Sequence, residues 1–379
     1  MKKILWITNL VPHYTKDMFQ SLACVLPQHG MEFYMLSGNN HRACGRVGIK
    51  EKVIRNEEKF NTVEIHLGTY VLYYQLGVME KVRDIMPDVV VTPSQVGGIT
   101  SWKLMRLRKS LGFRMVAWQC GFETHPGFVK DQILKRYVRG FDYHFAYHSN
   151  AKKYALRYGA AESRTVVMHN TINEQKIPLM AKSAARDRIR TLHPTVGDRR
   201  ILLYVGAVME EKRLDTVVRA LDMMRRADLV FVVVGDGPHM AALKKIYGER
   251  DDIVWAGRVI EGVAVYFAAA DIFIMPGTGG LALNEAMAHS LPIISGYADG
   301  SADDLIIDGE NGLRLKTGEA GEIAETISIL SDDGNLRAGM GRLSREILIR
   351  NYSYESFIER ICGTLRQAAL GTGVNSSWQ

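Results

Sequence analysis

The chain has 379 residues, 47% of them hydrophobic, and its 48 Lys and Arg against 41 Asp and Glu give a formal net charge of +7. This length suits two domains with sizeable cores, and no apolar run approaches the roughly 20 residues of a membrane-spanning helix, so no transmembrane segment is predicted. The four cysteines, Cys24, Cys44, Cys120 and Cys362, have neither zinc-site spacing nor a disulfide framework, which predicts a reducing compartment and no structural metal.

The first half of the chain alternates strand-like and helical patterns. Lys3–Thr8 is predicted as a buried strand and not as a signal peptide, because Thr8 and Asn9 interrupt its short apolar run. We therefore expect a cytoplasmic protein. Further strands are predicted at 31–37, 63–66, 88–92, 114–118 and 143–147, with a helix from about Asp17 to Leu26. This alternation is typical of βαβ units around a parallel sheet.

Two loops in this half are expected at the carboxyl edge of the sheet, where open α/β folds bind their ligands. The loop after the first strand holds His13, Tyr14 and Lys16, which we predict to contact a substrate. The loop after the strand at 114–118 holds Glu123 and His125. This carboxylate and imidazole pair can act on a substrate hydroxyl as acid or base. The alternative is an ordinary surface loop in both places.

Positive charge is concentrated in the first half. Residues 1–178 hold 25 Lys and Arg against 14 Asp and Glu, a balance of +11, and the remainder holds 23 against 27, a balance of −4; together these give +7. Within 95–160, 12 basic residues stand against three acidic ones. Basic and apolar residues are interleaved at 101–114. This stretch is either a crossover helix with its basic face in water or a helix lying on an anionic bilayer surface.

The second half repeats the alternation after a polar segment, 177–200, that suits a linker with a short helix. Strands are predicted at 201–206, 229–234 and 271–275, and helices at 265–271 and 281–289. Two further helices are predicted at 319–331 and 354–369, and the tail 371–379 is expected to be disordered.

The stretch 275–292, MPGTGGLALNEAMAHSLP, reads as strand end, glycine turn and helix. Glycines at such a junction allow close approach of a ligand, and the unpaired amides at the start of the helix suit a phosphate group. One turn further on, the two carboxylate oxygens of Glu285 can accept both hydroxyls of a ribose. A phosphate next to a ribose describes a nucleotide. The alternative is a tight turn with a solvated glutamate.

The stretch 275–292, with the runs DDLI at 303–306 and DGENGL at 308–313, resembles the C-terminal signature of glycosyltransferase family 4. Three earlier stretches resemble that family in the same order: Gly206 with Lys212 six positions later, the GDGP run at 235–238, and Gly257–Val259. Two positions depart from the family pattern. The first of two family glutamates falls on Gly277, and the family arginine falls on Ala207.

The resemblance implies a role for each matching residue. For Lys212 this role is to neutralise the donor diphosphate. Apart from the resemblance, we infer that Arg213 supplies the charge that Ala207 lacks, and the carboxylate and imidazole of Glu123 and His125 complete the expected catalytic set. No metal or other cofactor is expected, because Lys212, Arg213 and the amides of residues 279–281 replace a divalent cation. The donor-binding residues are expected to be Gly206, Gly235, Gly257, Arg258, Val259, Gly277, Thr278, Gly279, Gly280, Leu281 and Glu285.

The fold that the resemblance implies is α/β, with two Rossmann-like domains facing each other across a cleft, the GT-B arrangement. The expected bounds are 1–178 for an acceptor-binding domain, 179–200 for a linker and 201–370 for a nucleotide-sugar-binding domain, with the last helix crossing back to the first domain. The expected function is that of a retaining glycosyltransferase, a hexosyltransferase that moves a sugar from a UDP- or GDP-sugar to a hydroxyl.

The expected acceptor is a lipid-linked or oligosaccharide glycan in cell-surface polysaccharide synthesis, which makes capsule, exopolysaccharide or O-antigen. The protein would then work at the inner face of the cytoplasmic membrane, attached peripherally to anionic lipid, and no nucleic-acid partner is expected. Two alternatives stay open: a UDP-sugar epimerase on the same fold, and a nucleotide-sugar-binding protein that has lost catalysis, as Gly277 and Ala207 suggest.

Overall fold

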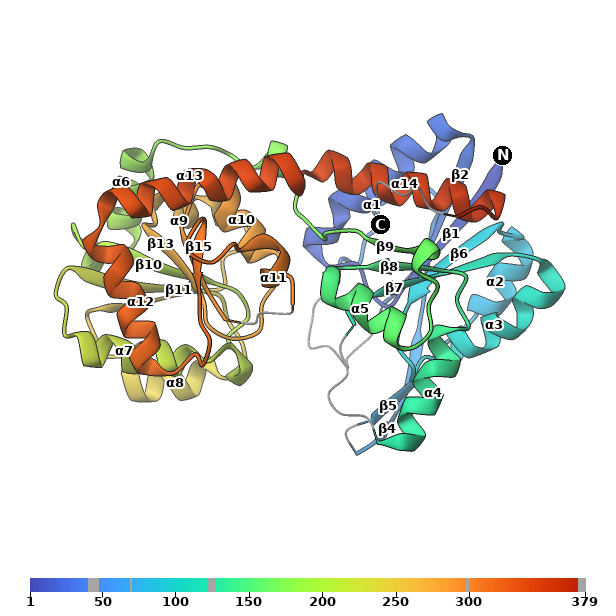
Figure 1. Ribbon diagram of the computed structural model, residues 1–379, viewed down its shortest axis with the longest axis horizontal. Coiled ribbons are helices and arrows are strands. Elements are labelled where there is room, and N and C mark those ends of the chain that lie inside the picture. The colour runs from blue at the N-terminus through green and yellow to red at the C-terminus, as the bar shows by residue number, and fades with distance from the viewer. Residues whose placement is uncertain (40–47, 69, 122–126, 297–299, 374–379) are drawn as a thin grey trace. The chain divides into compact units, whose positions relative to one another are not determined.

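The computed structural model describes residues 1–39, 48–68, 70–121, 127–296 and 300–373, and it divides into two compact units (Figure 1). The first unit comprises Met1–Asn170 together with the chain from Glu355 onward. The second unit is Thr171–Tyr354. The chain thus leaves the first unit after Asn170 and returns to it through its last helix.

The first unit is built on a parallel sheet of seven strands in the order β3-β2-β1-β6-β7-β8-β9. Side chains on both faces of the interior strand β1 are buried, with Leu5 and Ile7 on one face and Trp6 on the other. This is why the central strands read as continuous apolar runs. The strands are β1 (Lys2–Thr8), β2 (Met31–Gly38), β3 (Glu57–Phe60), β6 (Val89–Pro93), β7 (Arg114–Gln119), β8 (Tyr143–Ala146) and β9 (Thr165–Val167).

Helices cover this sheet, and one of them comes from the far end of the chain. The Phe357 ring of α14 is buried, with its centroid 6.5 Å from that of Trp118 in β7. The Tyr143 hydroxyl of β8 donates to the carbonyl oxygens of Gln367 and Thr372. The helices of this unit are α1 (Lys16–Val25), α2 (Val78–Ile85), α3 (Ile99–Leu111), α4 (Phe128–Val138), α5 (Ser149–Arg157) and α14 (Tyr354–Leu370).

A separate two-stranded hairpin leaves the first sheet between β3 and α2. Its strands, β4 (Thr62–Leu67) and β5 (Tyr70–Gln75), pair antiparallel with each other. The strand predicted at 63–66 therefore exists, but it is not part of the parallel sheet.

The second unit has a parallel sheet of six strands in the order β12-β11-β10-β13-β14-β15. In chain order this is 3-2-1-4-5-6, the order of a Rossmann fold. The strands are β10 (Arg200–Val205), β11 (Leu229–Val234), β12 (Ile253–Gly257), β13 (Ile272–Met275), β14 (Ile293–Ser295) and β15 (Gly312–Arg314).

Eight α-helices belong to the described part of the second unit, and they enclose its single large core. They are α6 (Lys182–Leu192), α7 (Leu214–Met224), α8 (Met240–Tyr247), α9 (Ala264–Ala269), α10 (Ala282–Ala288), α11 (Ala302–Leu305), α12 (Ala320–Asp332) and α13 (Gly334–Asn351).

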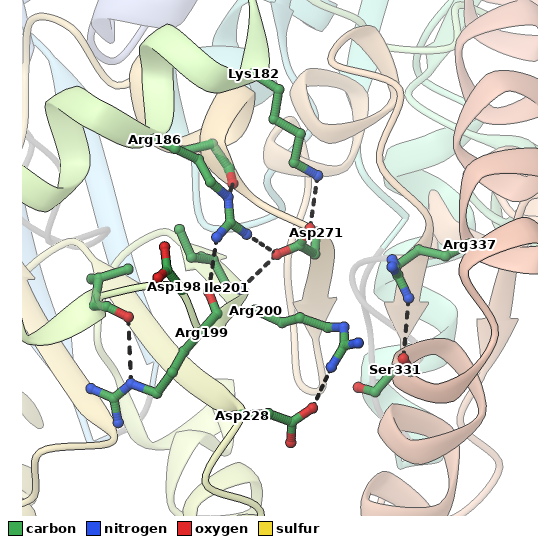
Figure 2. A network of polar contacts seen from close by, with 12 residues as sticks. Lys182, Arg186, Asp198, Arg199, Arg200, Ile201, Asp228, Asp271, Ser331 and Arg337 are labelled. Carbon is green, nitrogen blue, oxygen red and sulfur yellow. Dashed lines mark hydrogen bonds and ion pairs between the residues drawn. The ribbon is translucent and has the colours of Figure 1, made fainter.

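The segment expected as a linker forms α6 and is anchored to the second sheet by polar contacts (Figure 2). Asp271, 8% exposed at the start of β13, accepts hydrogen bonds from Lys182 Nζ at 2.8 Å and from the Arg186 guanidinium. The same carboxylate accepts from the Ile201 amide at 2.8 Å. The structure therefore groups residues 171–200 with the second unit, whereas the expected second domain began at 201. It also groups the last helix with the first unit.

Candidate functional site

The second sheet reverses its strand order between β10 and β13, because β11 lies on one side of β10 and β13 on the other. The loops that leave the carboxyl ends of two such strands flank the crevice in which open α/β sheets bind ligands. Here those loops begin at Gly206 and Pro276, and both were singled out in the sequence.

These two loops are joined by three hydrogen bonds. The Thr278 amide donates to the Glu211 carbonyl oxygen at 3.1 Å. Lys212 Nζ donates to the Thr278 carbonyl oxygen at 2.8 Å and to Thr278 Oγ1 at 3.0 Å. The Lys212 ammonium group is thus fixed on the turn that leads into α10, where the sequence predicted a site for the diphosphate.

Gly277 is fully enclosed by the other loop. A Cβ atom at this position would overlap the Glu211 carbonyl oxygen and lie 2.8 Å from Lys212 Cα. No larger residue fits without moving the backbone that carries Lys212. The absence of the family glutamate at this position therefore has a local steric reason.

Three more of the expected donor-binding glycines lie together where β10, β11 and β12 end. The Gly235 amide donates to the Gly257 carbonyl oxygen at 2.8 Å. A Cβ atom on Gly235 would overlap the Gly206 carbonyl oxygen. Arg258, which is exposed, and Val259, which is half-buried, follow directly after β12.

Glu285 lies in the first turn of α10 and is half-buried. Burial raises its pKa from 4.5 to about 7, because removal from water disfavours the charged form. The first hydrogen bonds of this helix are donated by Leu283 to Gly280 and by Glu285 to Leu281. The amides before Leu283, which include those of Gly279 and Leu281, precede this ladder.

Arg213 is the N-cap of α7 and has a left-handed backbone, with φ at +57°. Its guanidinium donates to the Thr317 carbonyl oxygen and to Glu319 Oε1, each at 3.2 Å. Arg213 is therefore already paired with a carboxylate. Its expected role at the diphosphate stays a prediction.

A cavity of about 380 Å³ lies next to the glycine turn, within the second unit. Its lining includes Gly277, Thr278, Arg213 and Glu211 from the two loops, and the segment Arg314–Gly318 after β15. Sequence reasoning missed this last segment. The signal was available, since the DGENGL run leads into a parallel strand whose carboxyl end lies at the same edge of the sheet.

Glu322 holds the end of this segment in place. Its carboxylate accepts hydrogen bonds from the amides of Lys316, Thr317 and Gly318 at 2.7, 2.9 and 2.7 Å. The Thr317 hydroxyl adds a fourth bond at 2.8 Å. Although burial acts in the opposite direction, these bonds lower the pKa of Glu322 to about 2.

The expected acceptor residues lie in the first unit, in the loop after β1. His13 and Tyr14 belong to a short 3-10 helix, His13–Thr15, and Lys16 begins α1; all three are exposed. Glu123 and His125 lie outside the described residues.

A partly buried polar network that the sequence did not indicate lies at the corresponding switch point of the first sheet, between β1 and β6. Asn9 donates to Gln95 Oε1 at 3.1 Å and accepts from Gln75 at 2.6 Å. The Tyr73 hydroxyl also donates to Gln95 Oε1, at 2.7 Å.

Within the described residues, no group of three or more His, Cys, Asp or Glu side chains is placed to hold a metal ion. In the same part of the chain, no helix combines the length and the apolar character needed to cross a bilayer.

Comparison with known proteins follows the same division of the chain. Residues 199–333 match the family model described as glycosyl transferases group 1. An uncharacterised glycosyltransferase of Methanocaldococcus jannaschii is 26% identical over 215 residues, which cover 52% of this chain and 54% of the relative. The GDP-mannose-dependent alpha-(1-6)-phosphatidylinositol monomannoside mannosyltransferase of Mycobacterium tuberculosis is 25% identical over 255 residues, with 63% and 65% covered. The chain thus spans between half and two thirds of the length of these relatives.

Solved structures extend the likeness of the fold to nearly the whole chain. A crystal structure of Anabaena HepE in complex with UDP aligns with a TM-score of 0.74 at 15% identity, covering 97% of this chain and 100% of HepE. Both units share the α/β architecture with parallel, Rossmann-like sheets, as the sequence predicted. Residues 199–333, which lie within the second unit, therefore match the group 1 glycosyl transferases, in a chain with the GT-B fold.

Proposed function

We propose that the chain is a glycosyltransferase that moves a sugar from a nucleotide-sugar donor to a hydroxyl group of a glycan. The observation that supports this most is the junction at the switch point of the second sheet. There Lys212 Nζ is held 2.8 Å from the Thr278 carbonyl oxygen, on the turn that precedes Glu285. A cation beside free amides suits a diphosphate, and a carboxylate one turn further along suits a ribose.

The proposed reaction needs a stabilised leaving group more than a nucleophile on the protein. The bond between the anomeric carbon and the diphosphate oxygen breaks, and the electron pair stays with the diphosphate. The acceptor oxygen takes its place with retention of configuration, and its proton passes to a base, for which Glu123 or His125 is proposed. Lys212, with the turn amides, would stabilise the charge that develops on the diphosphate.

The donor base stays open between uracil and guanine. The Mycobacterium tuberculosis relative is named for GDP-mannose, and HepE was crystallised with UDP and with UDP-glucose. In the family, the residue at the position of Gly277 faces the donor sugar. Because glycine has no side chain to contact a sugar there, the identity of the sugar stays open as well.

For the acceptor we propose a lipid-linked glycan of cell-surface polysaccharide synthesis, reached at an anionic membrane surface. The positive balance of residues 1–178 supports this, because anionic lipid attracts basic segments. The relatives point the same way, since one is named for a phosphatidylinositol mannoside and another for lipopolysaccharide core biosynthesis. His13, Tyr14 and Lys16 are the proposed acceptor contacts.

A thermal-shift titration with UDP, GDP, ADP and their sugar conjugates tests the donor site. A ligand that binds only the folded chain raises its melting temperature by mass action. We expect one nucleotide family to stabilise the protein, with the shift lost in Glu285→Ala and retained in Glu325→Ala, which removes an exposed carboxylate of α12. If no nucleotide shifts the wild-type chain, the proposed donor site is wrong.

The proposed absence of a metal requirement has its own test. Transfer measured in excess chelator should continue, because Lys212 and the turn amides would take the place of a divalent cation. Complete loss of transfer that magnesium restores would refute this part of the proposal.

A nucleotide-sugar-binding protein without catalysis is the second candidate, and Gly277 and Ala207 favour it. It would show the same thermal shift but neither transfer to any glycan acceptor nor hydrolysis of the donor. Analysis of the nucleotide sugar after incubation without acceptor also detects an epimerase, which would release an altered sugar nucleotide.

A further inference from the structure

The hairpin of the first unit presents an apolar face to solvent. Its register pairs Val63 with Tyr74, Ile65 with Leu72 and Leu67 with Tyr70. Directly paired residues lie on the same face and alternate residues share it, so all six side chains lie on one side of the hairpin. Val63, Ile65, Leu67 and Tyr70 are between 47% and 59% exposed. Contiguous apolar surface of this kind is uncommon on a protein that has no partner, and it usually marks an interaction site.

The exposed apolar surface continues onto the first turn of α4. Phe128 and Val129 are 80% and 71% exposed. Lys130, the next residue, has its Nζ 5.4 Å from the centroid of the Tyr70 ring. This contact brings the start of α4 to the hairpin, and Figure 1 shows the two side by side. We call Val63, Ile65, Leu67, Tyr70, Phe128 and Val129 the apolar patch.

Cations border the apolar patch at both ends of the hairpin. Lys130 lies over Tyr70 near the turn, and Lys103 Nζ lies 4.1 Å from the centroid of the Tyr74 ring near the base. Beyond Lys103, Arg83 and Arg106 line a hollow that also includes Glu80. The acidic neighbour on α4, Asp131, is paired with Lys135 at 2.7 Å. The border is therefore predominantly positive.

Helix α3, the stretch that the sequence offered as a bilayer helix, has its apolar side occupied. Leu104 is fully buried, and Trp102, whose indole nitrogen donates to the Val96 carbonyl oxygen at 2.9 Å, packs against the same core. Between β6 and β7 this helix is a crossover helix. Lys103 and Arg106, which are exposed, remain on its outer side.

We propose that the apolar patch is a docking surface for an anionic phospholipid bilayer. Its aliphatic and aromatic side chains would enter the boundary between headgroups and acyl chains, while Lys103 and Arg106 lie on lipid phosphates. The positive border is what selects an anionic membrane over a second copy of the chain, whose patch would carry the same cations and repel it. The proposed function supplies the reason for membrane binding, namely access to a lipid-linked acceptor. The binding itself does not depend on that function, because it requires no nucleotide-sugar donor.

Vesicle flotation of the full chain tests the surface. We expect binding to vesicles of phosphatidylglycerol and phosphatidylcholine that weakens at high salt, and little binding to phosphatidylcholine alone. Ile65→Ser with Leu67→Ser should weaken binding by about tenfold or more, because the inserted area is lost. Lys130→Glu should weaken it on the order of tenfold without removing any apolar group.

The matched controls lie on α8 of the second unit. Ile246→Ser removes an exposed aliphatic side chain and Lys245→Glu reverses an exposed charge, and both should bind vesicles as the wild type does. The nucleotide-induced thermal shift, measured on every variant, reports separately on folding and on the donor site. A lost shift with normal flotation would count against the proposed function and leave the docking surface standing.

Three results would overturn the docking surface. One is a wild-type chain that does not bind anionic vesicles even at low salt. Another is a double serine variant that binds as tightly as the wild type. The third is a wild-type dimer, measured by sedimentation, that the double serine variant converts to monomer, because the patch would then be an interface between copies of the chain.

Discussion

Glu285 combines a role in the proposed donor site with a cost to the folded protein. Its carboxyl is half-buried, and within the described residues it accepts no hydrogen bond. A buried carboxylate without partners is poorly stabilised as an anion. Ribose hydroxyls would supply the missing donors, so ligand binding and ionisation of Glu285 are expected to favour each other.

The first prediction concerns the pH dependence of stability. The pKa of Glu285 is about 7 in the folded chain against 4.5 without burial. As pH rises through this window, the Glu285 carboxyl ionises in the unfolded chain before it ionises in the folded chain. The wild type therefore loses stability with rising pH, and Glu285→Gln, which has no carboxyl at this position, does not. The variant should gain on the order of 1–3 kcal/mol over the wild type between pH 5 and pH 8.

Chemical denaturation at both pH values measures this difference. Glu325→Gln, an exposed neutralisation on α12, serves as the control and should show no such gain. An equal stability difference between Glu285→Gln and wild type at the two pH values would contradict the prediction. With nucleotide present, the wild-type thermal shift should grow from pH 6 to pH 8.

The second prediction concerns Gly277. Gly277→Ala places a methyl group against the backbone of Glu211 and Lys212, and such overpacking costs about 1–3 kcal/mol. The same substitution at Gly339, where a Cβ atom meets nothing within 4 Å inside α13, should stabilise the chain by about 0.5–1 kcal/mol. Urea denaturation of both variants compares them. A Gly277→Ala variant as stable as the wild type would show that the two loops separate freely.

The sequence indicated those residues of the proposed donor site that belong to local motifs. Lys212, Glu285 and the glycines follow strand ends, and strand order then brings them to one edge. The contacts of Arg213 were out of reach, because its partners Thr317 and Glu319 lie more than 100 residues away. The lining segment after β15 was missed although the DGENGL run that leads into β15 was recognised, because the step from that run to the edge of the sheet was not drawn.

Helix α6 is held to the second sheet in part by a single buried carboxylate. The Asp271 carboxylate joins Lys182 and Arg186 of this helix to the Ile201 amide at the start of β10 (Figure 2). The Arg186 side chain is only 16% exposed. Lys182, at 52% exposed, is expected to contribute little.

The third prediction follows from this burial. Asp271→Asn leaves the Arg186 guanidinium without its charged partner, so the free energy of unfolding should fall by about 3–5 kcal/mol. Asp187→Asn on the same helix removes a carboxylate that is 74% exposed and pairs with Arg190, and it should cost less than about 0.5 kcal/mol. Equal losses from the two substitutions, measured by urea denaturation, would mean that the buried network adds no specific stability.

Elements with a strong periodic signal were predictable and those without it were not. The apolar run of β11 is fully buried and reads directly as a strand. Three of the four residues of β3 are charged, and Glu57 is buried there because the Ser37 hydroxyl and the Val53 amide donate to it. Helix α13 was also missed. Its Gly341 lowers the helix propensity of the sequence. Only glycine fits at this position, because a Cβ atom would overlap the Ser290 carbonyl oxygen.

The whole molecule is defined by a first unit that is discontinuous in the chain. Residues 1–170 provide its sheet, and α14 provides the buried side chains of Phe357, Ile361 and Leu365. The second unit, Thr171–Tyr354, is continuous and contains its own core and the complete proposed donor site.

The fourth prediction is that the two units tolerate excision differently. A chain of residues 171–354 should fold cooperatively and keep the nucleotide-induced thermal shift of the full protein. A chain of residues 1–170 should lack a cooperative transition, because the Phe357 ring that packs beside Trp118 is missing and this part of the sheet is exposed to water. Circular dichroism melts of both test this. A cooperative melt of 1–170 equal to that of the first unit in the full chain would show that α14 is dispensable.

The return of α14 to the first unit also sets an order of events during synthesis. The ribosome releases the strands of the first sheet early, but the helix that covers them follows only after the whole second unit. The second unit therefore has all its parts before the first unit does. Folding of the second unit should finish first, and until α14 emerges the nascent first sheet depends on chaperones or on the ribosome surface to shield the apolar side chains that α14 will cover.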